Sequence, residues 1–162
     1  MTQASDEPLL NAEAAPGSIL IPVDSSAGAS RVISAGARIA RLNPVATVHV
    51  AHVFRTSRFD RARAGAPLPP SGDLIDEAKE QLEAHVRAAR RQCRNTVTSH
   101  FVVGDPTSEV LRLAGELKIE LLVIGTHDYA GFERFLLGSI AETLVRKAHC
   151  SVYVVRPTAY RE

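Results

Sequence analysis

A glycine-containing segment near the end of the chain has the residue types that bind phosphate. Gly125 ends an apolar run, and Gly138 and Ser139 come directly before a stretch with helical spacing. Glycine lets backbone N–H groups approach a phosphate closely, and the first turn of a helix adds unpaired N–H groups and the positive end of a dipole. The segment is therefore a candidate phosphate-binding loop. A structural interpretation stays open, in which Gly125 only permits a tight turn and Ser139 only caps its helix.

Five short apolar runs alternate with stretches of helical periodicity, which predicts an α/β fold. The first run, residues 18–24, has no alternation of polar and apolar residues, as is typical of a strand buried on both faces of a parallel sheet. Strands that alternate with helices imply right-handed crossovers and helices on both faces of the sheet. We expect a single-domain, doubly wound, five-stranded parallel sheet with strands at 18–24, 46–54, 96–103, 120–124 and 151–155.

The helices between these strands carry start signals and apolar stripes. Asp105 and Pro106 form an N-cap acid followed by a proline at the first helical position. Ser139 and Glu142 have capping-box spacing, so the last helix is expected to open at Ser139. The helix at 73–94 has acids at its start and bases at its end, in agreement with the helix dipole. The first helix, at 30–42, places four apolar residues on its inner side: Val32, Ala35, Ile39 and Leu42.

Ligands of such sheets bind beyond the carboxyl ends of the strands, where the winding direction reverses. The residues at those ends are Asp24, Val53, Gly104 and Gly125. The segment 55–72, which follows the second strand, holds four arginines that could fold over a triphosphate or form a solvated loop. Arg55 is the preferred candidate among them because it is nearest to the strand end.

The chain from Ile19 to Pro157 resembles the universal stress protein family. The resemblance rests on ILIPVD in the first strand, HV near the end of the second, GDP before the third helix, and LLVIGTH followed by FLLGSIAETLVRKAHCSVYVVRP. It implies a sheet in the order 3-2-1-4-5 and a homodimer built through the fifth strand. In one subgroup of the family it also implies ATP, bound by a G-x2-G-x9-G-[S/T] loop.

Carried over position by position, the resemblance gives a set of nine nucleotide-binding residues. Asp24 is expected to accept a hydrogen bond from the ribose or the adenine. The adenine and ribose are expected near Pro22, Val23, Asp24 and Val53, and the phosphates near Ile124, Gly125, Gly138, Ser139 and Ile140.

One position departs from the family loop, because Asp128 stands where the second glycine belongs. The backbone cost of an Asp at such a position is about 1 kcal/mol. A carboxylate about 4 Å from a phosphate charge costs on the order of 1 to 4 kcal/mol, depending on the dielectric. Asp128 therefore either repels the phosphates, points to solvent, or helps to hold a Mg²⁺ ion that bridges them.

Composition excludes several other classes of protein. The chain has 162 residues, the length of one domain, and we expect a flexible tail at 1–17, a domain at 18–157 and a short tail at 158–162. A net charge of +1 and few aromatic residues disfavour nucleic-acid binding. No apolar run approaches the roughly 20 residues of a membrane span, and no secretory signal precedes Cys93 and Cys150. We expect a cytoplasmic protein with reduced thiols, Cys150 being buried at the start of its strand.

Other chemistries find little support in the sequence. The six histidines have no pair with both the spacing and the companion ligand of a structural zinc site, so no metal site is expected. A receiver-type phosphoacceptor needs a cluster of acids at strand ends and a lysine. Asp24 and Asp105 end two strands, but no second acid adjoins Asp24, and Arg156 rather than a lysine precedes Pro157. No Ser/His/Asp or Cys/His set indicates an enzyme, although a slow ATPase side activity stays open. We expect a stress-response dimer that binds adenine nucleotide without efficient turnover. The alternative is a dimer that acts only through protein contacts.

Overall fold

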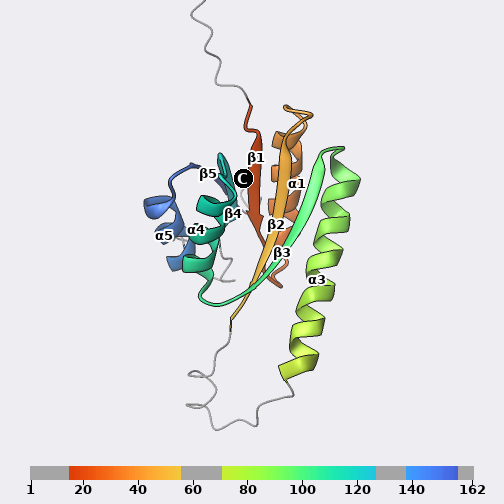
Figure 1. Ribbon diagram of the computed structural model, residues 1–162, viewed down its shortest axis with the longest axis vertical. Coiled ribbons are helices and arrows are strands. Elements are labelled where there is room, and N and C mark those ends of the chain that lie inside the picture. Colours follow the sequence, from red (N-terminus) through yellow and green to blue (C-terminus); the bar gives the residue numbers. More distant parts are fainter. Residues whose placement is uncertain (1–14, 56–70, 127–137, 157–162) are drawn as a thin grey trace, which may run out of the picture.

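The computed structural model describes residues 15–55, 71–126 and 138–156 (Figure 1). Strands and helices alternate along all three segments, as the apolar runs and helical stripes predict. The elements are β1 (Ser18–Pro22), α1 (Ala29–Ala40), β2 (Thr47–Phe54), α3 (Ser71–Gln92), β3 (Thr96–Val103), α4 (Pro106–Glu116), β4 (Leu121–Gly125), α5 (Ser139–Lys147) and β5 (Ser151–Val155).

The five strands form one parallel sheet in the order β3-β2-β1-β4-β5. The expected α/β fold and the strand order 3-2-1-4-5 are both confirmed. The chain winds outward from β1 to β3 and then returns to place β4 on the other side of β1. The direction of winding therefore reverses between β1 and β4, and a crevice is expected at their carboxyl ends.

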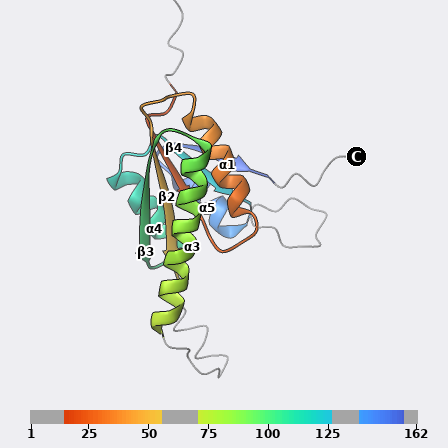
Figure 2. The same ribbon diagram turned by 90° about the vertical axis from the view of Figure 1, so that its right-hand side faces the viewer.

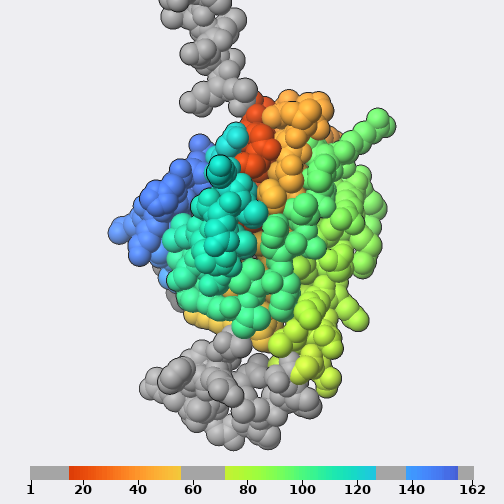
Figure 3. All heavy atoms as spheres, in the orientation of Figure 1, coloured from red at the N-terminus to blue at the C-terminus, as the bar shows by residue number. Residues whose placement is uncertain are grey.

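Helices cover both faces of the sheet (Figure 2). α1 and α3 pack on one face around a core that includes Ile21, Ile33 and Val86. α4 and α5 pack on the other face around Leu20, Leu122 and Leu144. In the space-filling view, part of β3 stays visible between α4 and α3 (Figure 3). The central strands are thus buried on both sides, which explains their continuous apolar sequence.

Gly36 allows α1 to approach β1 closely. A Cβ atom at this position would collide with the side chain of Ile21, which is itself fully buried. This close approach lets α1 pack tightly against the central strand of the sheet.

Two expectations about apolar residues are wrong. Leu42 is 73% exposed, because α1 ends at Ala40 and Leu42 lies in the turn beyond it. The inner face of α1 is instead completed by Ile33, Ala37 and Ala40. Cys150 is only half-buried, because β5 begins one residue later and lies at the edge of the sheet. Burial still raises the pKa of the Cys150 thiol.

Hydrogen bonds link Gly17, near the start of the described residues, to two other parts of the chain. The Gly17 N–H donates to Oε2 of Glu120 at 2.9 Å, and its carbonyl accepts from the Thr47 N–H at 2.9 Å. The tails predicted at 1–17 and 158–162 fall mostly outside the described residues, so the domain limits stay a prediction. Within the described segments, no helix is both long enough and apolar enough to cross a membrane.

Candidate nucleotide site

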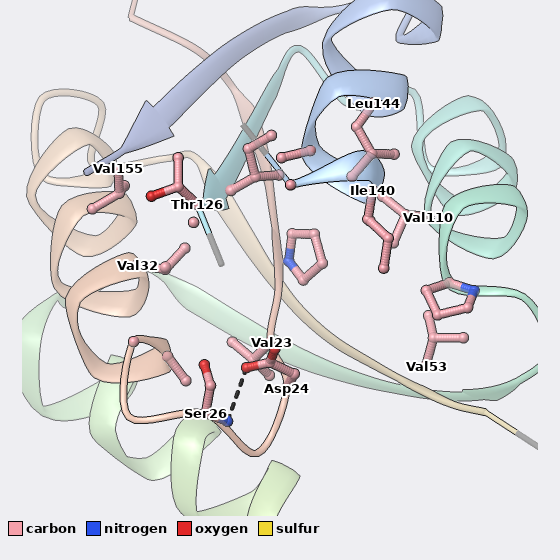
Figure 4. A pocket seen from close by; sticks show the side chains of 18 of the residues that line it. Val23, Asp24, Ser26, Val32, Val53, Val110, Thr126, Ile140, Leu144 and Val155 are labelled. Atoms are coloured by element: carbon pink, nitrogen blue, oxygen red, sulfur yellow. Dashed lines mark hydrogen bonds between the residues drawn. The ribbon is translucent and has the colours of Figure 1, made fainter. Parts of the chain in front are cut away.

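A cavity of about 440 Å³ lies at the carboxyl ends of the strands, where the winding reverses (Figure 4). This volume is within the usual range for small-molecule sites, roughly 300 to 1,000 Å³. All nine residues singled out in the sequence line it: Pro22, Val23, Asp24, Val53, Ile124, Gly125, Gly138, Ser139 and Ile140. They come together because the ends of parallel strands and the starts of the following helices meet at one edge of the sheet.

Apolar side chains form about half of the cavity wall. Val53 at the end of β2, Val110 of α4 and Ile140 of α5 lie on one side, with Leu144 behind Ile140 (Figure 4). Val32 of α1 and Val155 of β5 line another part of the wall. A flat, largely apolar ring system fits such walls better than a fully polar ligand does.

Asp24 supplies the carboxylate at the end of β1. One of its oxygens, Oδ1, accepts from the Ser26 N–H at 3.0 Å (Figure 4). This local bond shapes the turn that leads into α1, since a short carboxylate side chain readily bonds the backbone two residues further on. Gly125 at the end of β4 also fits closely here, because a Cβ atom would lie 3.0 Å from Cγ2 of Val32.

The N-terminus of α5 borders the cavity without a side-chain cap in the described structure. Gly138 is its N-cap residue, and Ser139 is already the first helical residue. The expected capping box is therefore wrong. Glu142 forms an ion pair with Arg146 at 3.1 Å, and the Ser139 carbonyl accepts from the Thr143 hydroxyl at 2.8 Å. Within the described residues, the first turn of α5 therefore has no side-chain cap to accept from its backbone N–H groups, and its residues Gly138, Ser139 and Ile140 line the cavity.

α4 begins differently, and its cap removes one candidate from the site. The carboxylate of Asp105 accepts from the N–H and the hydroxyl of Ser108, at 3.0 and 2.9 Å. These bonds hold the pKa of Asp105 below its ordinary value, with nearby Arg55 as a smaller cause. Asp105 does not line the cavity. The two acids that a receiver-type site would need, Asp24 and Asp105, therefore do not share this cavity.

The structure adds cavity residues that the sequence did not indicate. Pro106 and Val110 of α4, Leu144 of α5 and Ser26 in the turn before α1 all line the cavity. The positions of Val110 and Leu144 depend on how the helices pack. Ser26 and Pro106 could have been included from the sequence, because they lie in the loop or at the helix start directly after a strand.

The basic residues of the cavity are only partly predicted. Arg55, the preferred arginine, lines the cavity, and Arg31 of α1 does so as well. The other three arginines of segment 55–72, together with His127 and Asp128, lie outside the described residues. Across the segments 15–55, 71–126 and 138–156, no cluster of three or more His, Cys, Asp or Glu side chains suits a metal ion.

The doubly wound parallel sheet has its cavity at the switch point, the place where α/β proteins of this class bind their ligands. The model of the universal stress protein family matches residues 17–156. The chain therefore belongs to the universal stress protein family.

Named relatives agree with this assignment. The chain is 31% identical over 142 residues to universal stress protein MJ0531 of Methanocaldococcus jannaschii, covering 85% of this chain and 81% of that one. It is 32% identical over 146 residues to universal stress protein A homolog 1 of Coxiella burnetii, covering 85% and 94%. It also resembles the structure of the universal stress protein from Archaeoglobus fulgidus in complex with dAMP. That match has a TM-score of 0.61 and 29% identity, and covers 84% of this chain and 94% of that one.

Proposed function

We propose that this universal stress protein binds an adenine nucleotide, ATP, in the cavity at the ends of β1 and β4. The observation that carries the proposal is the meeting of apolar walls, the Asp24 carboxylate and the N-terminus of α5 around one cavity. The dAMP complex of the relative from Archaeoglobus fulgidus supports adenine as the base.

The base and the sugar are assigned to the side of the cavity formed by β1 and β2. Adenine packs against Val23, Val53 and Val110, because an aromatic ring gains free energy from contact with apolar walls. Asp24 accepts hydrogen bonds from the ribose hydroxyls, for which a carboxylate at the end of a strand is well suited.

The phosphates are assigned to the start of α5. The first-turn N–H groups and the helix dipole favour an anion beside Gly138 and Ser139. Of the described lining residues, Asp24 alone carries a carboxylate, and Arg31 and Arg55 carry positive charge. The balance of charge around the cavity therefore favours a phosphorylated ligand.

Mg²⁺ is assigned a secondary role in binding. Proteins usually hold Mg²⁺ through one or two carboxylates together with the substrate phosphates. The Ser139 hydroxyl at the proposed phosphate position could supply an oxygen ligand, Asp24 is assigned to the ribose, and Asp128 lies outside the described residues. We therefore expect Mg²⁺ to enter with the nucleotide. The effect of Mg²⁺ on ATP affinity then reports whether carboxylates near the phosphates help to hold the ion or repel the phosphates.

We further propose that the protein acts as a cytoplasmic homodimer that senses or stores the nucleotide without efficient turnover. β5 is an edge strand, and no described segment pairs with its outer side. Tyr153 in its middle is 48% exposed. An unprotected apolar edge tends to pair with another chain, so a second copy is the favoured partner. The same observation supports the alternative function, a dimer that acts through protein contacts alone.

Gly138→Asp tests the phosphate assignment. Gly138 has φ −57° and ψ 151°, a conformation open to any residue, and Asp is a favoured N-cap residue. We expect the melting temperature to stay the same or rise. ATP affinity should fall at least tenfold, because the new carboxylate competes for the N–H groups and repels the phosphates.

Two controls separate charge from helix capping in that experiment. Gly138→Asn offers a neutral cap and should weaken ATP binding less than Gly138→Asp does. Gly115→Asp adds the same charge on α4 where no atom lies within 4 Å of a Cβ, and should leave the affinity unchanged. If Gly138→Asp binds ATP as tightly as the natural protein, the phosphates do not bind at α5 and the proposed site is wrong.

A further inference from the structure

His52 of β2 is a buried polar side chain that lies beside the site without lining it. It is 8% exposed, and Asn95 is the one other buried polar side chain among the described residues. Its Nδ1 lies 3.0 Å from the carbonyl oxygen of Val23. A carbonyl oxygen only accepts, so Nδ1 carries the proton and donates.

The backbone of Val23 and Asp24 is held from several elements at once. The Val23 N–H donates to the carbonyl of Ala51 in β2 at 2.8 Å. The backbone of Asp24 also interacts with His85 of α3, and this interaction opposes the lowering of the His85 pKa by burial. The Ser26 N–H donates to the Asp24 side chain. The turn that presents Asp24 to the cavity is thus fixed from behind by β2 and α3.

We propose that His52 is a positioning residue for the nucleotide, acting through the Val23 carbonyl to hold the turn at Val23 and Asp24 in its binding conformation. The proposal rests on the proposed function, because the ligand of this turn is the adenine nucleotide. His52 and His85 do not line the cavity, so neither is assigned a contact with the ligand. A fixed turn favours binding because less conformational freedom is lost when the ligand arrives.

The hydrogen bond and the packing of His52 can be separated by substitution. The imidazole ring stacks on Phe101 of β3, with ring centroids 5.9 Å apart and planes inclined by 20°. His52→Phe keeps an aromatic ring on Phe101 and removes the donor. His52→Asn removes the ring and keeps an N–H donor at the position of Nδ1. If His52 had only a structural role, the ATP affinity of each variant would follow its melting temperature, and the less stable variant would bind ATP more weakly.

The first measurement is ATP affinity by calorimetry at a temperature where all variants are folded. We expect His52→Phe to bind about tenfold more weakly than the natural protein, and His52→Asn to bind within about twofold of it, whatever their order of melting temperatures. His100→Phe on β3 is the matched control, since the His100 ring contacts His49 rather than the turn. Equal affinity of His52→Phe and the natural protein, or equal weakening in His52→Asn, overturns the proposal.

The second measurement needs no ligand. Amide hydrogen exchange at Val23 and Ser26 in the nucleotide-free protein should be faster in His52→Phe than in the natural protein and unchanged in His52→Asn. Unchanged exchange in His52→Phe overturns the positioning role. If exchange behaves as expected and the natural protein binds no ATP, the proposed function fails while the control of the turn by His52 stands.

Discussion

At the scale of residues, three half-buried histidines with lowered pKa values predict that the folded protein is sensitive to acid. His49 of β2 and His100 of β3 face each other with Nδ1 and Nε2 3.0 Å apart, and the Thr98 hydroxyl lies 2.8 Å from Nδ1 of His49. Burial lowers the pKa of His49 below its ordinary value of 6.5, and the neighbouring His100 lowers it further. Burial also lowers the pKa of His100 and that of His85 beside the site.

The lowered pKa values predict a loss of stability in mild acid. Between pH 6.5 and the lower pKa values of the folded protein, the unfolded chain binds more protons than the folded one, so the free energy of unfolding falls as the pH falls. His100→Gln should make this dependence shallower, because it removes one histidine and its effect on His49. Melting temperatures from pH 7.5 down to about 5.5 measure the slope, a window well above the ordinary pKa of the carboxyl groups.

His149→Gln is the control for the pH series. His149 is exposed between α5 and β5, so its loss should leave the slope as it is in the natural protein. A slope in His100→Gln equal to that of the natural protein contradicts the assignment of the acid sensitivity to the His49 and His100 pair.

At the scale of elements, two helices that begin at the same edge of the sheet differ in how their N-termini are capped. α4 begins with a side-chain cap from Asp105, whereas α5 begins at a glycine beside the cavity. At the start of α4, the Asp105 carboxylate already accepts from a first-turn N–H group, so this cap contributes to the stability of the fold. The start without a side-chain cap has N–H groups that a ligand could accept from, as the proposed function requires.

Asp105→Ala tests the structural role of the α4 cap. Loss of the hydrogen bonds to Ser108 should lower the free energy of unfolding by about 1 kcal/mol, measured by urea denaturation. Asp105→Asn keeps an N-cap oxygen and should recover most of the loss. ATP affinity should not change in either variant, since Asp105 does not line the cavity. A strong loss of ATP affinity with unchanged stability would give Asp105 a role at the site instead.

The sequence predicts the elements well where the signal is local. The strands at 96–103 and 151–155 have the predicted limits, because runs of apolar and β-branched residues mark them. The N-cap at Asp105 also agrees. The exposed Leu42 and the absent capping box at Ser139 are missed, because a shift of one or two residues in a helix end reverses the role of the residues there.

The site is predictable only in part, because only some of its residues are marked by local sequence signals. Strand ends can be placed from the sequence, so residues such as Asp24, Val53 and Gly125 are found. Val110 and Leu144 reach the cavity through the packing of α4 and α5, and His52 reaches Val23 only because Pro22 pairs with Ala51 across two strands. Such register is a tertiary property that apolar patterns do not specify residue by residue.

At the scale of the whole molecule, the sheet has β3 at one edge and β5 at the other. β5 is short, half-exposed and adjacent to the site through Val155. Pairing between two copies through β5 would bury its edge and place the two cavities near the interface.

The proposed dimer predicts a doubled mass by light scattering at tens of micromolar protein. Tyr153→Lys should shift the protein toward the monomer, since it places a charge on the exposed face of β5. Val45→Lys is the control, because Val45 is 88% exposed in the turn before β2. A monomeric natural protein, or a dimer that survives Tyr153→Lys unchanged, contradicts pairing through β5.

The most direct test of the central claim is a calorimetric titration of the nucleotide-free natural protein with ATP, in the presence and absence of Mg²⁺, beside a titration with GTP. The account predicts saturable binding of one ATP per chain. GTP should bind more weakly, because guanine carries one more exocyclic polar group than adenine and the proposed base position lies between the apolar side chains of Val23, Val53 and Val110. No heat of binding with ATP, ADP or AMP at millimolar concentration, with or without Mg²⁺, would contradict it and leave the protein-contact dimer as the function of this chain.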